Sequence, residues 1–315
     1  MNRFAVLLAV VFTVVALWCG GWFFGAWWIR DQIGRQAFGA PAIGCAELAI
    51  AGLPFRFDIT CTGTRLGGGD VTMDIAELRA SVLVYNPTFT EIFAKGPAVL
   101  SDAFSGASYR LDWESLKASV RLDWTALERA SLVADGLVLS DSVLDVTEMA
   151  RARHLELHAL GAAGALGMDK RNLRVFARIE NAELGLFDDP VEVKASALVN
   201  EWPADIRQWT GPGSLQAWAV DGGSLEIEEA ALATGKLSAG LSGTLAPDGG
   251  GLVNGKLVLT SRGVGPLLRD FLAAPLAGAL LGPEDETGTA RQTLVFSHSV
   301  LRAGIVPLIE LPPLF

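Results

Sequence analysis

Beyond residue 40, apolar and polar residues alternate along one short segment after another. The clearest segments are residues 55–61, 191–199 and 237–245, and similar ones occur at 78–85, 109–113, 119–124, 155–159, 173–179 and 252–260. A period of two is typical of a β-strand that has one apolar and one polar face. The sequence therefore predicts a mainly β protein, with a large curved antiparallel meander sheet and a few short helices.

Turn signals separate several of these segments, as antiparallel hairpins require. They are Asp135-Gly136, Asp221-Gly222-Gly223 and the Gly-rich run 247–251. We expect a tight turn at each of them.

Few segments favour a helix. Residues 267–281 start well after Gly265-Pro266, but Pro275 should end or kink a helix there. Residues 203–209 could form a short helix. The tail 305–315 carries Pro307, Pro312 and Pro313, so we expect an edge strand followed by an extended end.

The N-terminus carries an uncharged apolar segment, Phe4–Ile29, between Arg3 and Arg30. A helix of that length is about 39 Å long, enough to cross a bilayer with some tilt. The aromatic residues expected at the membrane interface are Trp18, Trp22, Trp27 and Trp28. The alternative is a cleaved signal peptide, whose apolar core is usually only about 7–15 residues long. We predict a retained anchor.

The positions of the three cysteines bear on which cellular compartment the chain occupies. Cys45 and Cys61 lie 16 residues apart, around a strand and a turn, and a disulfide between them would suit an oxidising compartment. Cys19 lies inside the apolar segment. The alternative is a pair of buried thiols in a reducing cytosol. The disulfide interpretation places the bulk of the chain outside the cytoplasm. We therefore predict residues 1–30 as cytoplasmic tip and transmembrane anchor, and residues 31–315 as an exported body with a soft join near 201–213.

Composition disfavours several function classes. The formal net charge is −10, which argues against a nucleic-acid binder. Three His and three Cys leave little material for a metal centre. We therefore expect a protein that is not an enzyme and has no cofactor and no metal; its protein partners stay unknown.

The search for catalytic motifs finds near misses. The run from Gly250 to Lys256 has phosphate-loop spacing, but Leu257 stands where Ser or Thr is required. His154, Glu156 and His158 share one face of a predicted strand and could chelate a metal; the alternative is a solvated strand face. Neither motif predicts an active site.

The run Gly52-Leu53-Pro54-Phe55…Cys61, followed by Val84-Tyr85-Asn86-Pro87 and Gly96-Pro97, resembles an uncharacterised family of bacterial envelope proteins, domain of unknown function 2125. Residues 225–263 also resemble, more weakly, the repeated strands of AsmA-like envelope proteins, which are implicated in lipid movement. Neither resemblance implies catalytic residues. For a bacterial envelope protein with this anchor and disulfide, we predict a single-pass protein of the inner membrane with the body 31–315 in the periplasm.

Two functions remain. In the first, an anchored sheet binds or passes lipid acyl chains along an apolar groove. The candidate wall of that groove is Phe55, Phe57, Trp113, Trp124, Leu237 and Leu241. In the second, helix 267–281 closes the core, and the protein is a structural or assembly factor of the envelope that acts through protein contacts.

Overall fold

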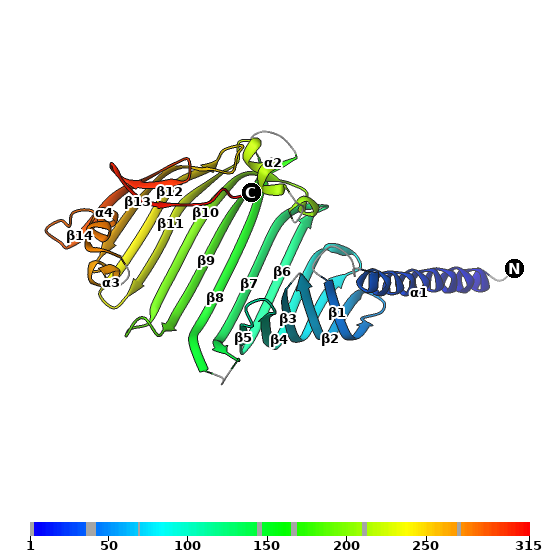
Figure 1. Cartoon of the computed structure of the whole chain (residues 1–315). Coiled ribbons are helices and arrows are strands. Elements are labelled where there is room, and N and C mark those ends of the chain that lie inside the picture. The colour runs from blue at the N-terminus through cyan, green and yellow to red at the C-terminus, as the bar shows by residue number, and fades with distance from the viewer. Residues whose placement is uncertain are drawn as a thin grey trace. The chain divides into compact units, whose positions relative to one another are not determined.

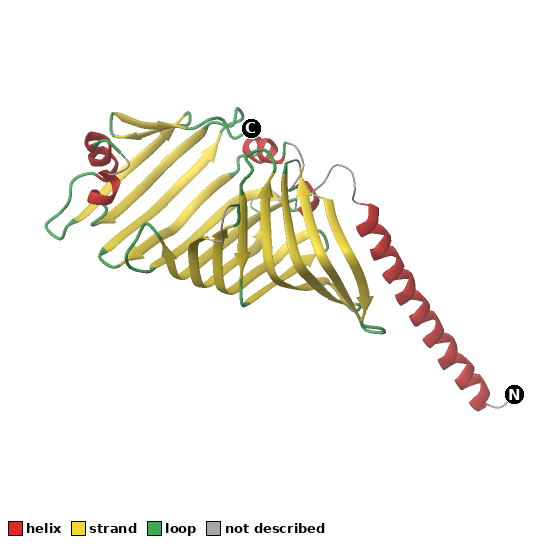
Figure 2. Ribbon diagram, turned by 60° about the horizontal axis from the view of Figure 1, so that its bottom comes forward, coloured by secondary structure: helices red, strands yellow, loops and turns green. Residues whose placement is uncertain are grey.

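The computed structural model describes residues 3–35, 42–68, 70–143, 147–164, 169–209, 213–269 and 272–315. Strands account for 61% of the chain, and the helices are few and, apart from the first, short (Figure 2). The mainly β class predicted from the alternation is confirmed.

Within the described residues, sixteen strands form one antiparallel sheet whose order follows the chain from β1 to β16 (Figure 1). The exception is β6, which leaves this path and pairs with β4 and β7. Each strand otherwise lies beside the strand that precedes it. Short turns join most of these antiparallel neighbours, whereas short helices lie between β10 and β11 and between β13 and β14. This is the predicted meander.

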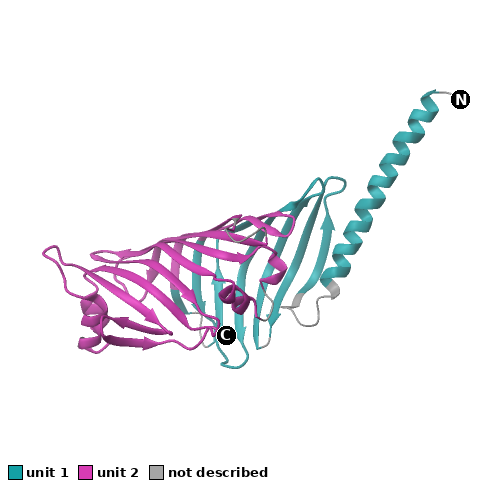
Figure 3. Ribbon diagram, turned by 90° about the horizontal axis from the view of Figure 1, so that it is seen from above, with its two compact units in different colours: residues 1–119, 136–149 teal, residues 120–135, 150–315 magenta. Residues whose placement is uncertain are grey.

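The chain divides into two compact units (Figure 3). Unit 1 comprises Met1–Ser119 and Gly136–Met149, and unit 2 comprises Val120–Asp135 and Ala150–Phe315. The predicted soft join near 201–213 falls inside the sequence range of unit 2, and its residues 210–212 lie outside the described residues.

Unit 1 holds the first helix, α1 (Arg3–Arg35), and the N-terminal strands. These strands are β1 (Ala42–Ala51), β2 (Arg56–Gly68), β3 (Val71–Leu83), β4 (Asn86–Asp102) and β5 (Ser108–Asp112). Three strands have residues in both units: β6 (Ser115–Asp123), β7 (Ala126–Asp141) and β8 (Thr147–Ala163).

Unit 2 holds the remaining elements. Its strands are β9 (Lys170–Leu184), β10 (Val191–Pro203), β11 (Ser224–Thr234), β12 (Leu237–Pro247), β13 (Val253–Arg262), β14 (Thr289–Ser297), β15 (Val300–Ala303) and β16 (Val306–Glu310). Its helices are η1 (Ile206–Gln208), α2 (Ser214–Val220), α3 (Gly265–Arg269) and α4 (Ala274–Leu281).

The two segments predicted to be helical do contain helices, but the bounds and the type of helix differ. The predicted segment 267–281 is split into α3 and α4, and Pro275 lies in the first turn of α4, where its missing N–H costs no hydrogen bond. The segment 203–209 forms only the 3₁₀ turn η1. The helix α2 was not predicted.

One predicted turn is wrong. Asp135-Gly136 lies within the continuous strand β7, not between two strands. Gly136 has φ +62°, and a Cβ there would lie 2.5 Å from the Glu114 side chain. Gly136 thus allows an irregularity inside the strand. An Asp-Gly dipeptide can mark such an irregularity as well as a hairpin turn. The turns at 221–223 and 247–251 are confirmed.

Candidate functional site

The pairing register of unit 2 brings apolar residues of neighbouring strands into rows. One row crosses β8 to β13 and consists of Leu157, Ala177, Ala195, Ala230, Leu241 and Leu259. The row on one side consists of Leu155, Ile179, Val193, Leu232 and Ala239. The row on the other side consists of Ala159, Val175, Ala197, Ile227, Gly243 and Leu257. Side chains two residues apart on a strand share a face, so these rows form one surface, here called the apolar face of unit 2.

One end of the apolar face is covered. Leu257, Leu294 and Ala303 are buried, and Ala279 and Leu280 of α4 pack against them together with Leu308 of β16. Gln292, the partner of Leu259 on β14, donates from Nε2 to the carbonyl oxygen of Ala279 over 2.9 Å. This hydrogen bond fixes α4 over the β13–β14 end of the face.

The other end of the apolar face is open to solvent. Leu157 on β8 is 41% exposed and Val175 on β9 is 36% exposed. Between the two ends, Ala195, Ala230 and Leu241 are half-buried. The sheet therefore has a closed core under α4 and an uncovered apolar surface at β8 and β9.

A shallow depression of about 200 Å³ lies in the middle of the face. Its lining includes Ala195, Ala230 and Ala239, with larger neighbours such as Leu232 and Leu241. The hollow arises because short alanine side chains stand between leucines in adjacent rows. Such a surface accepts an apolar group and provides few polar groups to bind anything else.

Two glycines shape the same region of the sheet. Gly243 on β12 has φ +143° and Gly255 on β13 has φ +151°. A Cβ on Gly243 would lie 2.1 Å from the Lys256 carbonyl oxygen, and one on Gly255 would lie 2.1 Å from that of Thr244. Only glycine permits this close approach of the two backbones.

The candidate wall residues of unit 2 lie in different settings. Leu241 lines the depression, and Leu237 occupies the same strand, half-buried, opposite Thr234. Trp124 lies in the turn after β6, 86% exposed, with φ +53°. Leu241 therefore belongs to the apolar face of unit 2, whereas Trp124 projects from a turn.

The other candidate wall residues belong to unit 1. Trp113 follows β5, is half-buried, and donates from Nε1 to the Ala94 carbonyl oxygen over 2.9 Å. Phe57 stacks on Trp22 of α1, with ring centroids 5.3 Å apart. Phe55 is 62% exposed in the turn before β2.

The aromatic residues predicted for the membrane interface differ in exposure. Trp27 and Trp28 are 57% and 52% exposed on α1. Trp22 is 8% exposed, because its ring packs on Phe57 and its Nε1 donates to the Arg56 carbonyl oxygen over 2.9 Å. Trp22 thus faces its own chain.

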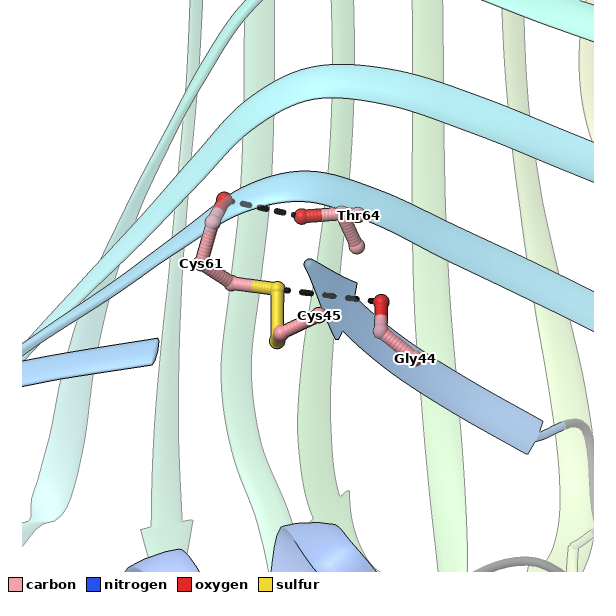
Figure 4. Close-up of a disulfide and its surroundings, with 4 residues drawn as sticks. All are labelled: Gly44, Cys45, Cys61 and Thr64. Carbon is pink, nitrogen blue, oxygen red and sulfur yellow. Dashed lines mark hydrogen bonds between the residues drawn. A yellow bond between two sulfur atoms is a disulfide. The ribbon is translucent and has the colours of Figure 1, made fainter. Parts of the chain in front are cut away.

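The predicted disulfide joins Cys45 of β1 to Cys61 of β2, with Cα atoms 5.3 Å apart (Figure 4). That Cα separation is in the usual range for a disulfide. Thr64 donates from Oγ1 to the Cys61 carbonyl oxygen over 2.9 Å, next to the bridge. The bond ties the first strand after α1 to the second strand, and the prediction is confirmed.

His154 lies between two carboxylates on the polar side of unit 2. Its Nδ1 is 2.6 Å from Asp135 Oδ1 and its Nε2 is 2.9 Å from Glu156 Oε1. The hydrogen bonds to Glu156 and then Asp135 raise the pKa of His154, and the bond to His154 lowers the pKa of Glu156. His158 Nδ1 instead lies 3.0 Å from Ser131 Oγ. Among the described residues, no three His, Cys, Asp or Glu side chains are grouped to hold a metal ion.

Several residues of these sites were not predicted from the sequence. Ala177, Ala195 and Ala230 carry no distinctive chemistry, and only the register shows that they line up. The contact of Trp18 with Pro54, 36 residues apart, also has no local signal. The alternation of 191–199 and 237–245 was the one usable clue to the apolar face.

Comparison with known proteins bears on identity. No curated protein and no solved structure matches the chain, and the resemblance to AsmA-like proteins is not shown. The family model for an uncharacterised protein conserved in bacteria, DUF2125, matches residues 22–312. The first resemblance is thereby confirmed, and the chain belongs to the DUF2125 family.

Proposed function

We propose that this protein is a non-enzymatic protein of the bacterial envelope, anchored in the inner membrane by α1, which binds phospholipid acyl chains on the apolar face of unit 2. The observation that carries the proposal is the continuous set of apolar rows, closed at α4 and open at Leu157 and Val175. Large uncovered apolar surfaces usually mark interaction sites.

The dimensions of the apolar face suit an acyl chain. From β8 to β13 the face extends about 24 Å, at about 4.8 Å per strand. A monolayer of the bilayer core, which holds one extended acyl chain, is about 15 Å thick. Burying ten methylenes would contribute about 8 kcal/mol at 0.8 kcal/mol each, enough to offset much of the cost of leaving the bilayer.

The chemistry of the face favours a non-specific apolar ligand. Leucine, isoleucine, valine and alanine side chains make up its rows, together with Gly243. Glu226 and Thr244 alternate with these residues along their strands and so lie on the opposite side. A surface of this kind gains free energy by excluding water from methylenes. It has no groups that would activate a substrate, which supports a binding role.

The anchor and the disulfide support the proposed location. Arg3–Ile33 is long and apolar enough to cross a membrane. The Cys45–Cys61 bridge is a bond that persists in oxidising compartments such as the periplasm. We therefore propose a cytoplasmic N-terminus and a periplasmic location for the residues after α1.

A second candidate function rests on the covered end of the face. Because α4 and β16 close the sheet over Leu257 and Leu294, unit 2 has a packed core of its own there. If a protein partner covers Leu157 and Val175 in the same way, the chain acts as a structural or assembly factor of the envelope.

Site-specific photocrosslinking in cells tests the two functions against each other. A photoreactive phenylalanine analogue replaces Leu157 in the full chain, in cells whose phospholipids carry radioactive phosphate. The matched control is Leu160, which is on the same strand, is 48% exposed, and lies on the opposite face.

The lipid proposal predicts a radiolabelled chain from position 157 and little label from position 160. A crosslinked protein partner at position 157, without phospholipid, would instead support the assembly factor. Equal phospholipid labelling at both positions would contradict a lipid site on the apolar face.

A further inference from the structure

The turn between β1 and β2 is bound directly to the apolar helix α1. Trp18 donates from Nε1 to the Pro54 carbonyl oxygen, and Trp22 donates to that of Arg56, each over 2.9 Å. The ring of Phe57 fits against Gly25, where a Cβ would lie 2.9 Å from the phenyl ring. Trp18, Trp22 and Gly25 have the spacing i, i+4 and i+7, so they lie on one face of α1. That face of the helix holds the turn.

In Figure 3, α1 extends from the strands of unit 1, which are drawn in the same teal. If α1 crosses the membrane as proposed, the charged residues Arg30 and Asp31 mark the level at which it leaves the apolar region. Trp18 lies about 18 Å below Arg30 along the helix at 1.5 Å per residue. The headgroup layer is only about 5–8 Å thick on each side, so Trp18 and the turn it binds lie at the depth of the acyl chains.

The side chains of the turn suit that depth. Leu53 is 44% exposed and Phe55 is 62% exposed. Tyr85, 72% exposed, lies in the next turn, where the Val84 N–H donates to the Phe55 carbonyl oxygen over 2.9 Å. Exposed apolar side chains such as these gain free energy when they leave water for the acyl chains.

Several backbone polar groups of the turn are hydrogen-bonded. This suits a low-dielectric medium, where unpaired polar groups are costly. The Gly52 carbonyl oxygen accepts from the N–H groups of Phe55 and Arg56. The carbonyl oxygens of Pro54, Phe55 and Arg56 accept from Trp18, Val84 and Trp22, as described above. Pro54 has no N–H to satisfy.

The one charge at this end is neutralised. Arg56 Nε lies 2.7 Å from Asp58 Oδ2, and its long side chain, 57% exposed, can extend toward the headgroups. The opposite end of the unit 1 strands is acidic instead, with Asp70 and Asp102 in its turns. An anionic membrane surface would therefore repel the acidic end more than the end that carries the Arg56–Asp58 ion pair.

We propose that the turn Gly52–Arg56 inserts Leu53 and Phe55 among the phospholipid acyl chains of the same leaflet that the C-terminal half of α1 crosses, below the headgroups. This inference rests on the proposed membrane anchor and is independent of the lipid site in unit 2. The inserted turn gives unit 1 a second attachment to the bilayer besides the helix.

Depth-dependent fluorescence quenching tests the inserted turn in the full chain. The protein carries Cys19→Ala, so that an introduced cysteine is the only free thiol beside the Cys45–Cys61 bridge. An environment-sensitive dye is attached to Phe55→Cys in vesicles of phosphatidylethanolamine and phosphatidylglycerol. The vesicles contain lipids spin-labelled near the headgroup or deep in the acyl chain.

Two labelled positions serve as controls. Phe104→Cys lies beyond the opposite end of β3 and β4, about 40 Å away at 3.3 Å per residue along the 13 residues of β3, and Phe104 is 88% exposed. Phe12→Cys lies on α1, and Phe12 is 72% exposed. Phe12 reports on the anchor and Phe104 reports on the solvent-facing end of unit 1.

The expected result is loss of most of the dye fluorescence at positions 55 and 12 with the deep spin label, and no loss at position 104 with either label. Loss at position 12 without loss at position 55 would overturn the inserted turn and leave the anchor intact. No loss at either position would overturn the anchor, and the inference with it.

A second variant tests the role of α1. Trp18→Phe with Trp22→Phe keeps the apolar rings of the helix and removes both indole donors. Quenching at position 55 should fall in this variant, because two carbonyl oxygens of the turn then lose their partners and favour water. Unchanged quenching would overturn the claim that α1 holds the turn in the membrane.

Discussion

Leu157 of β8 lies directly opposite Ala177 of β9 at the uncovered end of the apolar face of unit 2. The pair continues through Ala195 and Ala230 to Leu241, so one apolar row connects exposed and half-buried residues. An acyl chain bound at Leu157 could therefore extend along the row toward the part of the sheet that α4 covers.

The disulfide should be present in cells. Thiol labelling of the denatured, unreduced full chain is expected to leave Cys45 and Cys61 unmodified, while Cys19 reacts. Replacing both cysteines with serine should lower the free energy of unfolding by about 3 kcal/mol, because a bridge closing a loop of this size restricts the unfolded chain. Complete labelling of all three cysteines without reductant would contradict the bridge and weaken the proposed location.

Gly243 should tolerate no side chain. Gly243→Ala would place a Cβ 2.1 Å from the Lys256 carbonyl oxygen at φ +143°, so we expect a loss of about 2 kcal/mol or more in unfolding free energy. The control is Gly240→Ala on the same strand, where the nearest atom to a new Cβ is the Thr260 carbonyl oxygen at 4.0 Å. Chemical denaturation of both variants measures the difference; equal stability would show that the backbones can separate freely.

The alternation of apolar and polar residues was enough to predict the strands but not their partners. Segments 191–199 and 237–245 form β10 and β12 as expected, whereas the alignment of Ala195 with Ala230 and Leu241 depends on the turns and on the bulge between Ser196 and Ala197. A shift of one residue would turn every side chain to the other face. For that reason, inward and outward residues could not be assigned from the sequence.

The candidate wall residues show the same limit of prediction from the sequence. Its residues were chosen for size and apolarity, and only Leu241 lines the depression, while the alanines that create the hollow were missed. Asp135-Gly136 was misinterpreted because a glycine with positive φ serves a strand irregularity as well as a hairpin. Contacts between distant segments, such as Trp18 with Pro54, follow from the folded unit and have no local pattern.

His154 should make stability depend on pH. Its pKa is raised above the ordinary value of 6.5 by Glu156 and Asp135. The unfolded chain lacks these partners, so the contribution is fully present below about pH 6.5 and is lost as the pH rises through the raised folded-state pKa. Asp135→Asn with Glu156→Gln should return the pKa toward 6.5 and flatten this dependence.

Nuclear magnetic resonance titration of the histidine rings measures the His154 pKa directly, and a His154→Gln variant assigns its signal among the three histidines of the chain. Thermal unfolding at pH 5 and pH 9 supplies the second measurement. An unchanged His154 midpoint in the double variant would contradict the assigned role of the two carboxylates.

Reporter fusions after Phe315 test the topology. An exported phosphatase reporter should be active and a cytoplasmic fluorescent reporter silent, because α1 would carry the following residues across the inner membrane. Deleting Phe4–Ile29 should reverse both results. A fluorescent, cytoplasmic fusion to the intact chain would contradict the topology.

The central claim is tested most directly by the phospholipid that copurifies with the full chain, counted by mass spectrometry. Leu157→Asp with Val175→Asp places two carboxylates on the open end of the apolar face, and Leu160→Asp places one on the opposite face of β8. We predict about a tenfold loss of bound lipid in the first variant, since a cost of about 1.4 kcal/mol suffices for that factor, with circular dichroism and lipid in the control unchanged. Undiminished lipid in a folded double variant, or unfolding of that variant, would contradict an open acyl-chain site.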